Sequence, residues 1–598
     1  MKKTFYNQMR FVYSLVWRTT PGMIVWQSIV SLLQVFESFL FNVVFIKLIV
    51  QFLEMQYDVI HIVVLALVAI LLKFSIAIIN SIYLSKIKAI YAIRLSKYIN
   101  MLLFKKALSL DLEQYEKKEF FDKYYKAMSQ AYKKIEAVLT NSIQLMGNTL
   151  AAIIMVVYVV KIDPMLSLLI VVPLITSAAI KYMNKAQYIL SMENMSLDRE
   201  MGYINRVVYM KDYALELRLT DIFLCLKEKY LTASIKVQDN YKRYGKRLTF
   251  LRFISEYILT TLTILFSYLY IGRRYIYQQD IALGDFAVLV SAVSNMNFKV
   301  SSLLKNIFAL QESGMYIRNI QDYLNIVPSI DKNTDGVTID NNKEFYIKFD
   351  NVGFRYIESD VWALRNINIK ISKGQKIAIV GSNGSGKSTF IKLLLRLYDV
   401  DIGNISINGI EINSLNLDAY RNMFAPVFQD YRLFAVSLMD NITMGTTTDK
   451  DRINEALHNV GLSDFVNSLD RGINSVFSKE IDEKGIVFSG GQSQKLALSR
   501  GFASNAEIII FDEPSASLDP ISEHTLFENI YNALRDKTVL FVSHRLTSTI
   551  RADKIIMFDK GEIVECGTHR ELMEKKGAYY RMFNIQADAY REDGTCRV

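Results

Sequence analysis

The sequence predicts a chain in two parts: a membrane-embedded, all-helical part followed by a water-soluble α/β domain. The 598 residues are 51% hydrophobic although 22% are charged, and the hydrophobic excess lies before residue 311. From Tyr346 onward, short β-branched runs alternate with helical patterns. That alternation is typical of an α/β domain with at least some parallel strands.

The membrane part is predicted from hydrophobic stretches, since a bilayer requires about 20 mostly apolar residues per helix. Six stretches meet or approach this length: residues 22–51, 59–84, 139–160, 165–182, 248–271 and 283–310. The connections between the second and third runs and between the fourth and fifth exceed fifty residues and have helical patterns. We expect membrane helices that continue beyond the bilayer, turn near residues 112–125 and 212–223, and return.

The basic residues of these long connections predict the orientation. Under the positive-inside rule they lie in the cytoplasm, and both termini lie there too. Arg273 and Arg274 fall in a predicted outer loop and oppose this orientation, but the long basic segments outweigh them. We therefore expect a transmembrane domain over residues 1–317, a linker over 318–345, an α/β domain over 346–590 and a tail over 591–598.

Charge and cysteine usage exclude other classes of protein. The net charge of +10 could indicate a nucleic-acid partner, but many basic residues lie in the long connections between hydrophobic runs, so no nucleic acid is expected. Cys225, Cys566 and Cys596 are far apart and form no CxxC pair, which predicts neither a disulfide framework nor a zinc site.

The stretch "GSNGSGKS", from Gly381 to Ser388, fits the phosphate-binding pattern G-x-x-x-x-G-K-[ST]. It follows the apolar run "IAIV" and opens the predicted helix "STFIKLLLRL". Glycines let backbone N–H groups approach phosphate oxygens, and the helix start adds partial positive charge. Lys387 would then pair with the β- and γ-phosphates, and the Ser388 hydroxyl would hold Mg²⁺.

Two carboxylates end the apolar strand in "IIIFDEP", residues 508–514. Taken alone, Asp512 and Glu513 could equally cap the following turn. Beside a phosphate loop we favour a chemical role, in which Asp512 holds the Mg²⁺ shell and Glu513 polarises the attacking water.

The phosphate loop, "SGGQ", "FDEPSASLD" and "VSHR" occur in an order and spacing that resemble the nucleotide-binding domain of ATP-binding cassette (ABC) transporters. With six hydrophobic runs ahead of it, the whole chain resembles an ABC exporter half-transporter. The fold class implied is an all-α exporter membrane domain followed by an α/β P-loop ATPase domain. Phe488 stands where the family usually has Leu, and we expect this to affect only packing.

The resemblance implies a role for each matching position. Glu513, His544 and Gln429 would be catalytic, with His544 on the γ-phosphate and Tyr356 stacked on adenine. The metal ligands would be Ser388, Gln429 and Asp512. The nucleotide-binding residues implied are Tyr356, Gly381, Ser382, Asn383, Gly384, Ser385, Gly386, Lys387, Ser388, Thr389, Gln429, Ser489, Gly490, Gly491, Gln492 and Asp519.

A partner chain is also implied. In the family, the signature loop "SGGQ" of one cassette faces the phosphate loop of another, with ATP between them. Every catalytic position is present in this chain, so two copies would form two complete sites. A homodimer is expected, and a heterodimer is not excluded.

The sequence indicates the identity of the transported cargo less clearly than it indicates the ATPase activity. Residues 110–127 and 213–219 resemble the intracellular segments of bacterial lantibiotic and bacteriocin exporters, which favours ATP-driven peptide efflux across a bacterial cell membrane. Export of a drug or lipid is the alternative, and an ATP-gated channel or regulatory protein is a third. Because the first cysteine is Cys225, no amino-terminal cysteine peptidase is expected.

Four charges fall inside the predicted spans. Glu37 and Lys73 each lie about 18 residues from position 55, and Glu256 and Lys299 lie about 22 and 21 residues from position 278. At about 1.5 Å per residue, each pair has a matched depth on antiparallel helices. We expect these charges either to pair or to line a wet cavity, the alternative being that they face cytosolic water.

Overall fold

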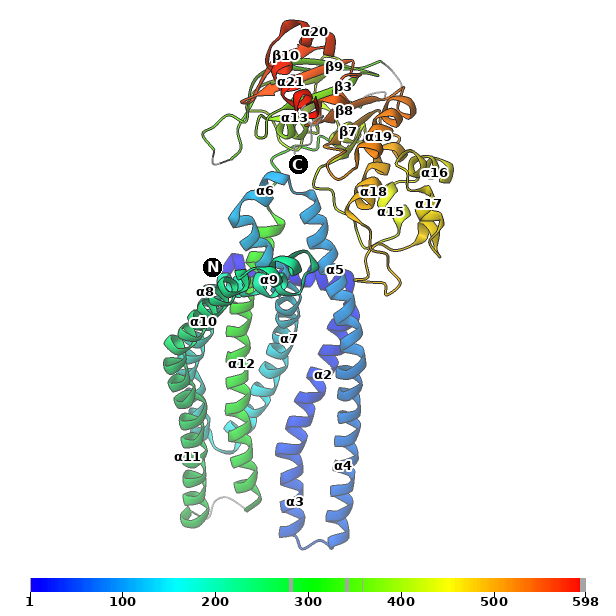
Figure 1. Ribbon diagram of the computed structural model, residues 1–598. Helices are drawn as coiled ribbons and strands as arrows, with labels where there is room; N and C mark the ends of the chain where they lie inside the picture. The colour runs from blue at the N-terminus through cyan, green and yellow to red at the C-terminus, as the bar shows by residue number, and fades with distance from the viewer. Residues whose placement is uncertain (1, 279–282, 339–343, 358, 592–598) are drawn as a thin grey trace. The chain divides into compact units, whose positions relative to one another are not determined.

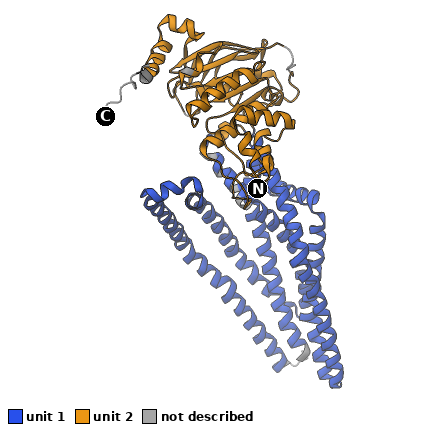
Figure 2. Ribbon diagram, turned by 45° about the vertical axis from the view of Figure 1, so that its right-hand side comes forward, with its two compact units in different colours: residues 1–110, 115–327 blue, residues 111–114, 328–598 orange. Residues whose placement is uncertain are grey.

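The computed structural model describes residues 2–278, 283–338, 344–357 and 359–591. The chain forms two compact units, coloured separately in Figure 2. Unit 1 contains residues 1–110 and 115–327, and unit 2 contains residues 111–114 and 328–598. The last helix of unit 1 runs to Leu324, seven residues past the sequence-based end of the membrane domain at 317.

Unit 1 is entirely helical (Figure 1). The α-helices in this part of the chain are α1 (Lys2–Thr19), α2 (Pro21–Phe39), α3 (Phe45–Glu54), α4 (Val59–Ile82), α5 (Lys88–Ser109), α6 (Leu112–Glu116), α7 (Lys118–Ile162), α8 (Val171–Tyr209), α9 (Ala214–Leu219), α10 (Ile222–Arg252), α11 (Leu259–Arg273) and α12 (Leu283–Leu324). Short π-helical segments continue α2 into α3, α4 into α5 and α10 into α11 without a break.

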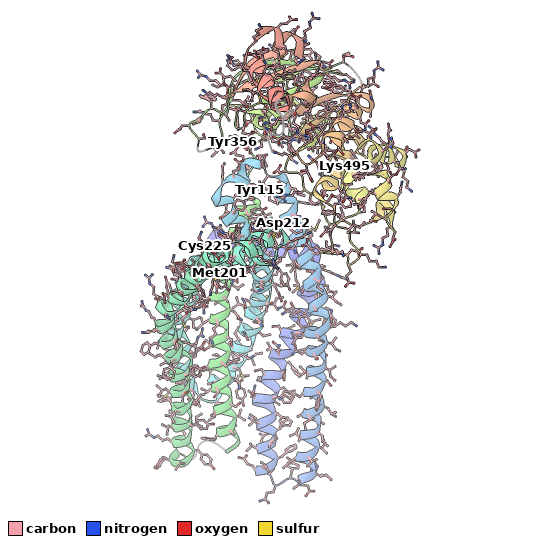
Figure 3. The ribbon with its side chains drawn as sticks, viewed as in Figure 1. Tyr115, Met201, Asp212, Cys225, Tyr356 and Lys495 are labelled. Carbon is pink, nitrogen blue, oxygen red and sulfur yellow. The ribbon has the colours of Figure 1, made fainter. Side chains whose placement is uncertain are left out.

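These helices confirm the predicted membrane part. The described residues contain six helices long and apolar enough to cross a bilayer: Pro21–Glu54, Val59–Ser109, Ala131–Ile162, Pro164–Tyr209, Ile222–Tyr277 and Asp285–Leu324. Their windows are only 11–44% buried within the chain, as expected of helices whose apolar faces contact lipid or another chain. The short helices α6 and α9 occupy the two predicted turns, and Figure 3 shows Tyr115 and Asp212 at the same end of unit 1.

The interior of unit 1 has two apolar clusters along α7 and α12. One gathers residues of α1, α2 and α5 around these helices, and includes Leu95, Ile135 and Ile317. The other lies toward the α11–α12 turn, where the Asp163 carboxylate accepts from the Met165 N–H and pairs with Arg274 at 2.6 Å. This ion pair neutralises one of the two arginines that opposed the predicted orientation.

Of the two arrangements expected for Glu256 and Lys299, the structure does not show the pair, and Lys299 lines a cavity instead. Glu256 instead forms an ion pair with Lys305, with 2.8 Å between Oε1 and Nζ. The partner of Glu256 thus lies six residues farther along α12 than the position counted from the sequence. Lys73 lies 5.7 Å from the ring centroid of Phe41.

Unit 2 combines two sheets with surrounding helices. Its strands are β1 (Tyr346–Phe354), β2 (Leu364–Ser372), β3 (Lys376–Gly381), β4 (Ile402–Ile407), β5 (Ile410–Glu411), β6 (Phe424–Val427), β7 (Ile508–Asp512), β8 (Thr538–Val542), β9 (Lys554–Asp559) and β10 (Glu562–Gly567). Its helices are α13 (Lys387–Leu394), α14 (Leu417–Arg421), α15 (Leu438–Thr443), α16 (Lys450–Asn459), α17 (Ser463–Asn467), α18 (Gly490–Ala503), α19 (Pro520–Ala533), α20 (His569–Lys575) and α21 (Ala578–Arg591).

The larger sheet has the order β10-β9-β3-β8-β7-β6, with β9, β3, β8, β7 and β6 parallel and β10 antiparallel. The smaller sheet, β2-β1-β4-β5, is antiparallel. Side chains of β3 alternate between two cores: Ile377 and Ile379 pack with the smaller sheet, while Ala378 and Val380 pack with α18 and α19. A strand buried on both faces explains the unbroken apolar run "IAIV".

Candidate functional site

The candidate site lies where four parallel strands end. Gly381 ends β3, Asp512 ends β7, and His544 and Gln429 each follow their strand, β8 or β6, by two residues. Because the carboxyl ends of parallel strands share one edge of a sheet, the fold brings together motifs up to 163 residues apart in sequence.

The phosphate loop requires glycine at two positions. Gly381 has φ +145°, and a Cβ there would lie 2.3 Å from the Phe558 carbonyl oxygen. Gly386 has φ +109°, and its Cβ would lie 2.6 Å from Leu364 Cδ2. The loop then enters α13, where the Lys387 ammonium donates to the carbonyl oxygens of Gly381 and Ser382, at 2.9 Å each. An ammonium has three donors, so one remains for a phosphate oxygen.

Burial perturbs both charges next to the loop. It raises the pKa of Asp512 to about 6, with a further increase from the adjacent Glu513 carboxylate. Burial also lowers the pKa of Lys387, which the carboxylates of Glu513 and Asp512 partly offset. The buried carboxylate is thus poorly compensated by the protein alone and favours a cation beside it.

Glu513 is held by two side chains from other strands. Its Oε1 lies 2.6 Å from His544 Nε2, and its Oε2 accepts from Gln429 Nε2 at 2.6 Å. Its backbone has φ +51°, the left-handed region, which costs a non-glycine residue about 1–2 kcal/mol. A carboxylate held in a strained position, with a histidine and an amide fixing its two oxygens, can orient and polarise a water molecule.

Tyr356 lies in the loop after β1 (Figure 3). Its hydroxyl is 3.1 Å from Thr389 Oγ1, which connects it to the start of α13. The Lys392 ammonium lies 5.4 Å from the ring centroid. The structure thus brings the aromatic ring predicted to stack on a base next to the helix that follows the phosphate loop.

The "SGGQ" motif begins α18. Ser489 Oγ accepts from the Gln492 N–H at 3.2 Å, and Gln492 Oε1 accepts from the Ser489 N–H at 2.9 Å, which is a capping box. Ser489, Gly491, Gln492 and Asp519 line a cavity of about 270 Å³, whose lining includes no phosphate-loop residue. Within one chain, the signature motif thus lines a cavity to which the phosphate loop does not contribute.

Three further residues of this region were not predicted from the sequence. Lys495, labelled in Figure 3, lines the signature cavity. Gln494 is buried, donates to the Glu513 carbonyl oxygen at 3.3 Å and accepts from the Ser517 N–H at 2.8 Å. Gln586 of α21 donates to the His544 carbonyl oxygen at 2.6 Å and accepts from the Leu546 N–H at 2.9 Å. Gln494 and Lys495 lie just after the "SGGQ" motif, which could have drawn attention to them. No sequence pattern near Gln586 predicts its contact with the His544 loop.

The donor set fits a magnesium ion. Ser388, Gln429 and Asp512 offer hydroxyl, amide and carboxylate oxygens, and Mg²⁺ is typically held by one or two carboxylates together with phosphates and water. The described residues contain no group of three or more His, Cys, Asp or Glu side chains that could hold a metal by themselves. The Ser385 hydroxyl oxygen is buried in the same loop without a hydrogen-bond partner.

Comparison with known proteins decides the family. A model of the ABC transporter family matches residues 364–516. The subtilin transport ATP-binding protein SpaT of Bacillus subtilis is 29% identical over 493 residues, 81% of this chain and 79% of SpaT. A putative multidrug export ATP-binding/permease protein of Staphylococcus aureus is 40% identical over 246 residues, 41% of this chain and 42% of that protein. The solved structure of a bacterial Atm1-family ABC exporter with ATP bound shares the fold, with TM-score 0.72 and 20% identity over 96% of this chain and 99% of that one.

The chain is an ABC exporter half-transporter. As an ABC exporter it couples ATP hydrolysis to transport, and it is a multi-pass membrane protein with a cytoplasmic ATPase domain. The unusual Phe488 of this exporter packs edge-on against Phe465 and Phe477, beneath the start of α18.

Proposed function

We propose that this exporter moves a lantibiotic- or bacteriocin-like peptide out of the cytoplasm, working as a homodimer with two ATP sites. The observation that carries the peptide class is the extent of the likeness to SpaT. At 493 residues, the alignment is longer than the whole of unit 2, so it includes membrane helices as well as the ATPase. Because cargo contacts lie in membrane helices, likeness there bears on cargo more than likeness in a cassette.

Export of a drug or lipid is the second candidate. It is favoured by the higher identity, 40%, to the putative multidrug export protein. That alignment covers 246 residues, less than half of either chain, and supports the ATPase more than a particular cargo.

In the proposed site, Lys387 binds the β- and γ-phosphates and Tyr356 stacks on adenine. The backbone N–H groups of residues 381–389 contact the phosphate oxygens. Mg²⁺, held by Ser388, Gln429 and Asp512, would supply charge stabilisation at the phosphates. This assignment explains why a buried Asp512 with a raised pKa is tolerated at the loop.

Glu513 is the proposed general base. It orients the attacking water and takes its proton at a carboxylate oxygen, while His544 holds the carboxylate and contacts the γ-phosphate. The contacts of 2.6 Å to His544 and Gln429 fix both oxygens of Glu513 before substrate is bound. Such preorganisation avoids a reorganisation cost during the reaction.

The separation of the two nucleotide-binding surfaces in one chain supports the dimer. The signature cavity, lined by Ser489, Gln492 and Asp519, contains none of the phosphate loop. In a pair of chains, each signature surface would cover the partner's phosphate loop, and ATP would join the two. Hydrolysis removes that bridging charge and shifts the population toward an open pair, so the membrane passage alternates between its two sides.

The test is cargo movement against a gradient. Purified full-length protein in inside-out vesicles is given ATP, Mg²⁺ and a fluorescent lantibiotic precursor, and uptake is measured alongside a Glu513→Gln control. We expect accumulation above the external concentration in the wild type and none in the variant. Equilibration without accumulation would instead indicate an ATP-gated channel, and uptake of an amphiphilic dye but no peptide would favour drug export.

A further inference from the structure

A polar cavity of about 290 Å³ lies among the membrane helices of unit 1. Its walls come from three helices shown in Figure 1: α2, α7 and α12. The lining residues are Ser31, Gln34, Val35, Gln144, Gly147, Asn148, Phe298, Lys299, Ser302, Lys305 and Asn306. Eight of these eleven side chains are hydrogen-bonding groups, which is unusual at membrane depth and marks a place that water or a polar ligand enters.

The charges on the cavity wall have one sign. Lys299 and Lys305 line it, and no aspartate or glutamate does. Behind the wall, Glu256 pairs with Lys305 at 2.8 Å, which occupies one of that ammonium's donors. The Glu37 carboxylate interacts electrostatically with Lys299, but no ion pair within 4.0 Å joins them among the described residues. Lys299 therefore presents the less compensated charge.

A second observation points to a ligand. Asn306 is 8% exposed, lines the cavity, and its Nδ2 has no hydrogen-bond partner. A buried amide donor without a partner is costly unless something that enters the cavity accepts its hydrogen bond. The Lys299 ammonium and the unpartnered Asn306 amide N–H are both hydrogen-bond donors. The occupant that satisfies them presents acceptors and a negative charge.

We propose that this cavity binds a carboxylate of the peptide cargo, with Lys299 contacting the carboxylate and Asn306 donating to a peptide carbonyl. This inference rests on the proposed peptide function. At about 290 Å³ the cavity is at the small end of ligand pockets, so it accommodates one terminal or acidic residue while the rest of the peptide lies outside. The selectivity it confers is for acidic or free-acid cargo over its neutralised form.

The experiment compares two synthetic peptides that differ only at one end. A neutral-dye-labelled decapeptide is made with a free C-terminal carboxylate and as its C-terminal amide, and each is titrated by fluorescence anisotropy onto full-length protein in phosphatidylcholine nanodiscs at neutral pH. In the wild type we expect about tenfold tighter binding of the acid. Lys299→Met reduces this ratio to about one, and Lys299→Arg retains it.

Two controls separate a local effect from a global one. Lys73→Met removes a lysine from a membrane helix outside the cavity and keeps the wild-type ratio. Asn306→Leu removes the donor at similar volume, and weakens both peptides to a similar extent because a carbonyl is common to both. Thermal unfolding in detergent checks that each variant is folded.

The outcomes distinguish failure of the cavity assignment from failure of the proposed peptide export. An acid-to-amide ratio that survives Lys299→Met, or falls equally in Lys73→Met, overturns the cavity assignment even if ATP-driven peptide uptake is intact. Absence of uptake of either peptide overturns the peptide function itself, and the inference with it. If phosphatidylglycerol abolishes the acid preference and stimulates ATP hydrolysis in the wild type but not in Lys299→Met, a lipid headgroup occupies the cavity and the assignment is wrong.

Discussion

Replacing Gln586 by leucine tests whether helix α21 positions His544, the histidine proposed to contact the γ-phosphate. Gln586 contacts the backbone directly after the His544 side chain, by donating to the His544 carbonyl oxygen and accepting from the Leu546 N–H. His544 in turn contacts Glu513. The leucine variant is close in volume but removes both hydrogen bonds.

The expected magnitude follows from those two bonds. Each neutral hydrogen bond contributes about 0.5–1.5 kcal/mol, so the pair contributes about 1–3 kcal/mol to holding the His544 loop. If that energy is lost from the transition state, kcat for ATP hydrolysis falls about 5- to 150-fold. The KM for ATP stays within about twofold, because Gln586 has no contact with the phosphate loop.

The assay is steady-state ATP hydrolysis by full-length protein in liposomes, with Ile585→Ala as the matched control. Ile585 is the preceding residue on α21, is 72% exposed, and should tolerate the change. Gln586→Glu keeps the acceptor for Leu546 and loses the donor, so its kcat should lie between wild type and leucine. In a His544→Ala background, Gln586→Leu should add nothing further. A loss confined to KM, or a full additional loss in that background, would refute the positioning role.

Further predictions concern four residues of the proposed nucleotide site. Lys387→Ala should abolish ATP turnover, so hydrolysis at the wild-type rate in a coupled assay would disprove the phosphate-loop assignment. Glu513→Gln should still bind ATP while turnover falls by about 10²–10⁴, the scale of a general base; the two chains should then stay closed on ATP, as measured by crosslinking. Since the pKa of Asp512 is raised to about 6, Mg²⁺-dependent ATP binding should weaken about tenfold per pH unit below 6, and Asp512→Asn should lose that dependence in titrations from pH 5 to 7.5. The same raised pKa means that the stability contribution of Asp512 to the nucleotide-free protein is fully present below pH 4 and is lost as pH rises through 6, so its melting temperature should move opposite to Mg²⁺ affinity. Gly386→Ala should destabilise the protein by about 1–3 kcal/mol, because its Cβ meets Leu364 at 2.6 Å, whereas Gly374→Ala has a positive φ but open space and should cost less in thermal unfolding.

The sequence predicts those features that are determined by a single short segment of the chain. The apolar runs revealed all six membrane helices because bilayer thickness sets their length. The phosphate loop, the Asp512–Glu513 pair and the "SGGQ" helix start each carry a pattern tied to backbone geometry, and the structure places the first two at one edge of the sheet.

Other features depend on contacts between distant segments, which no local pattern encodes. Gln586 reaches a loop 42 residues away through the packing of α21. Glu256 pairs with Lys305 and not with Lys299, which lies six residues earlier on α12, and counting residues along the sequence does not resolve such an offset. The cavity of Lys299 and Asn306 is made by three helices from both ends of unit 1, so only tertiary structure reveals it.

The left-handed backbone at Glu513 has a consequence for anyone engineering this transporter. Glycine at this position would relax the backbone conformation. A selection for thermal stability alone should therefore enrich Glu513→Gly, a more stable protein that does not hydrolyse ATP. The proposed general base is thus also a position where the backbone is strained, and a directed-evolution experiment must measure transport as well as thermal stability.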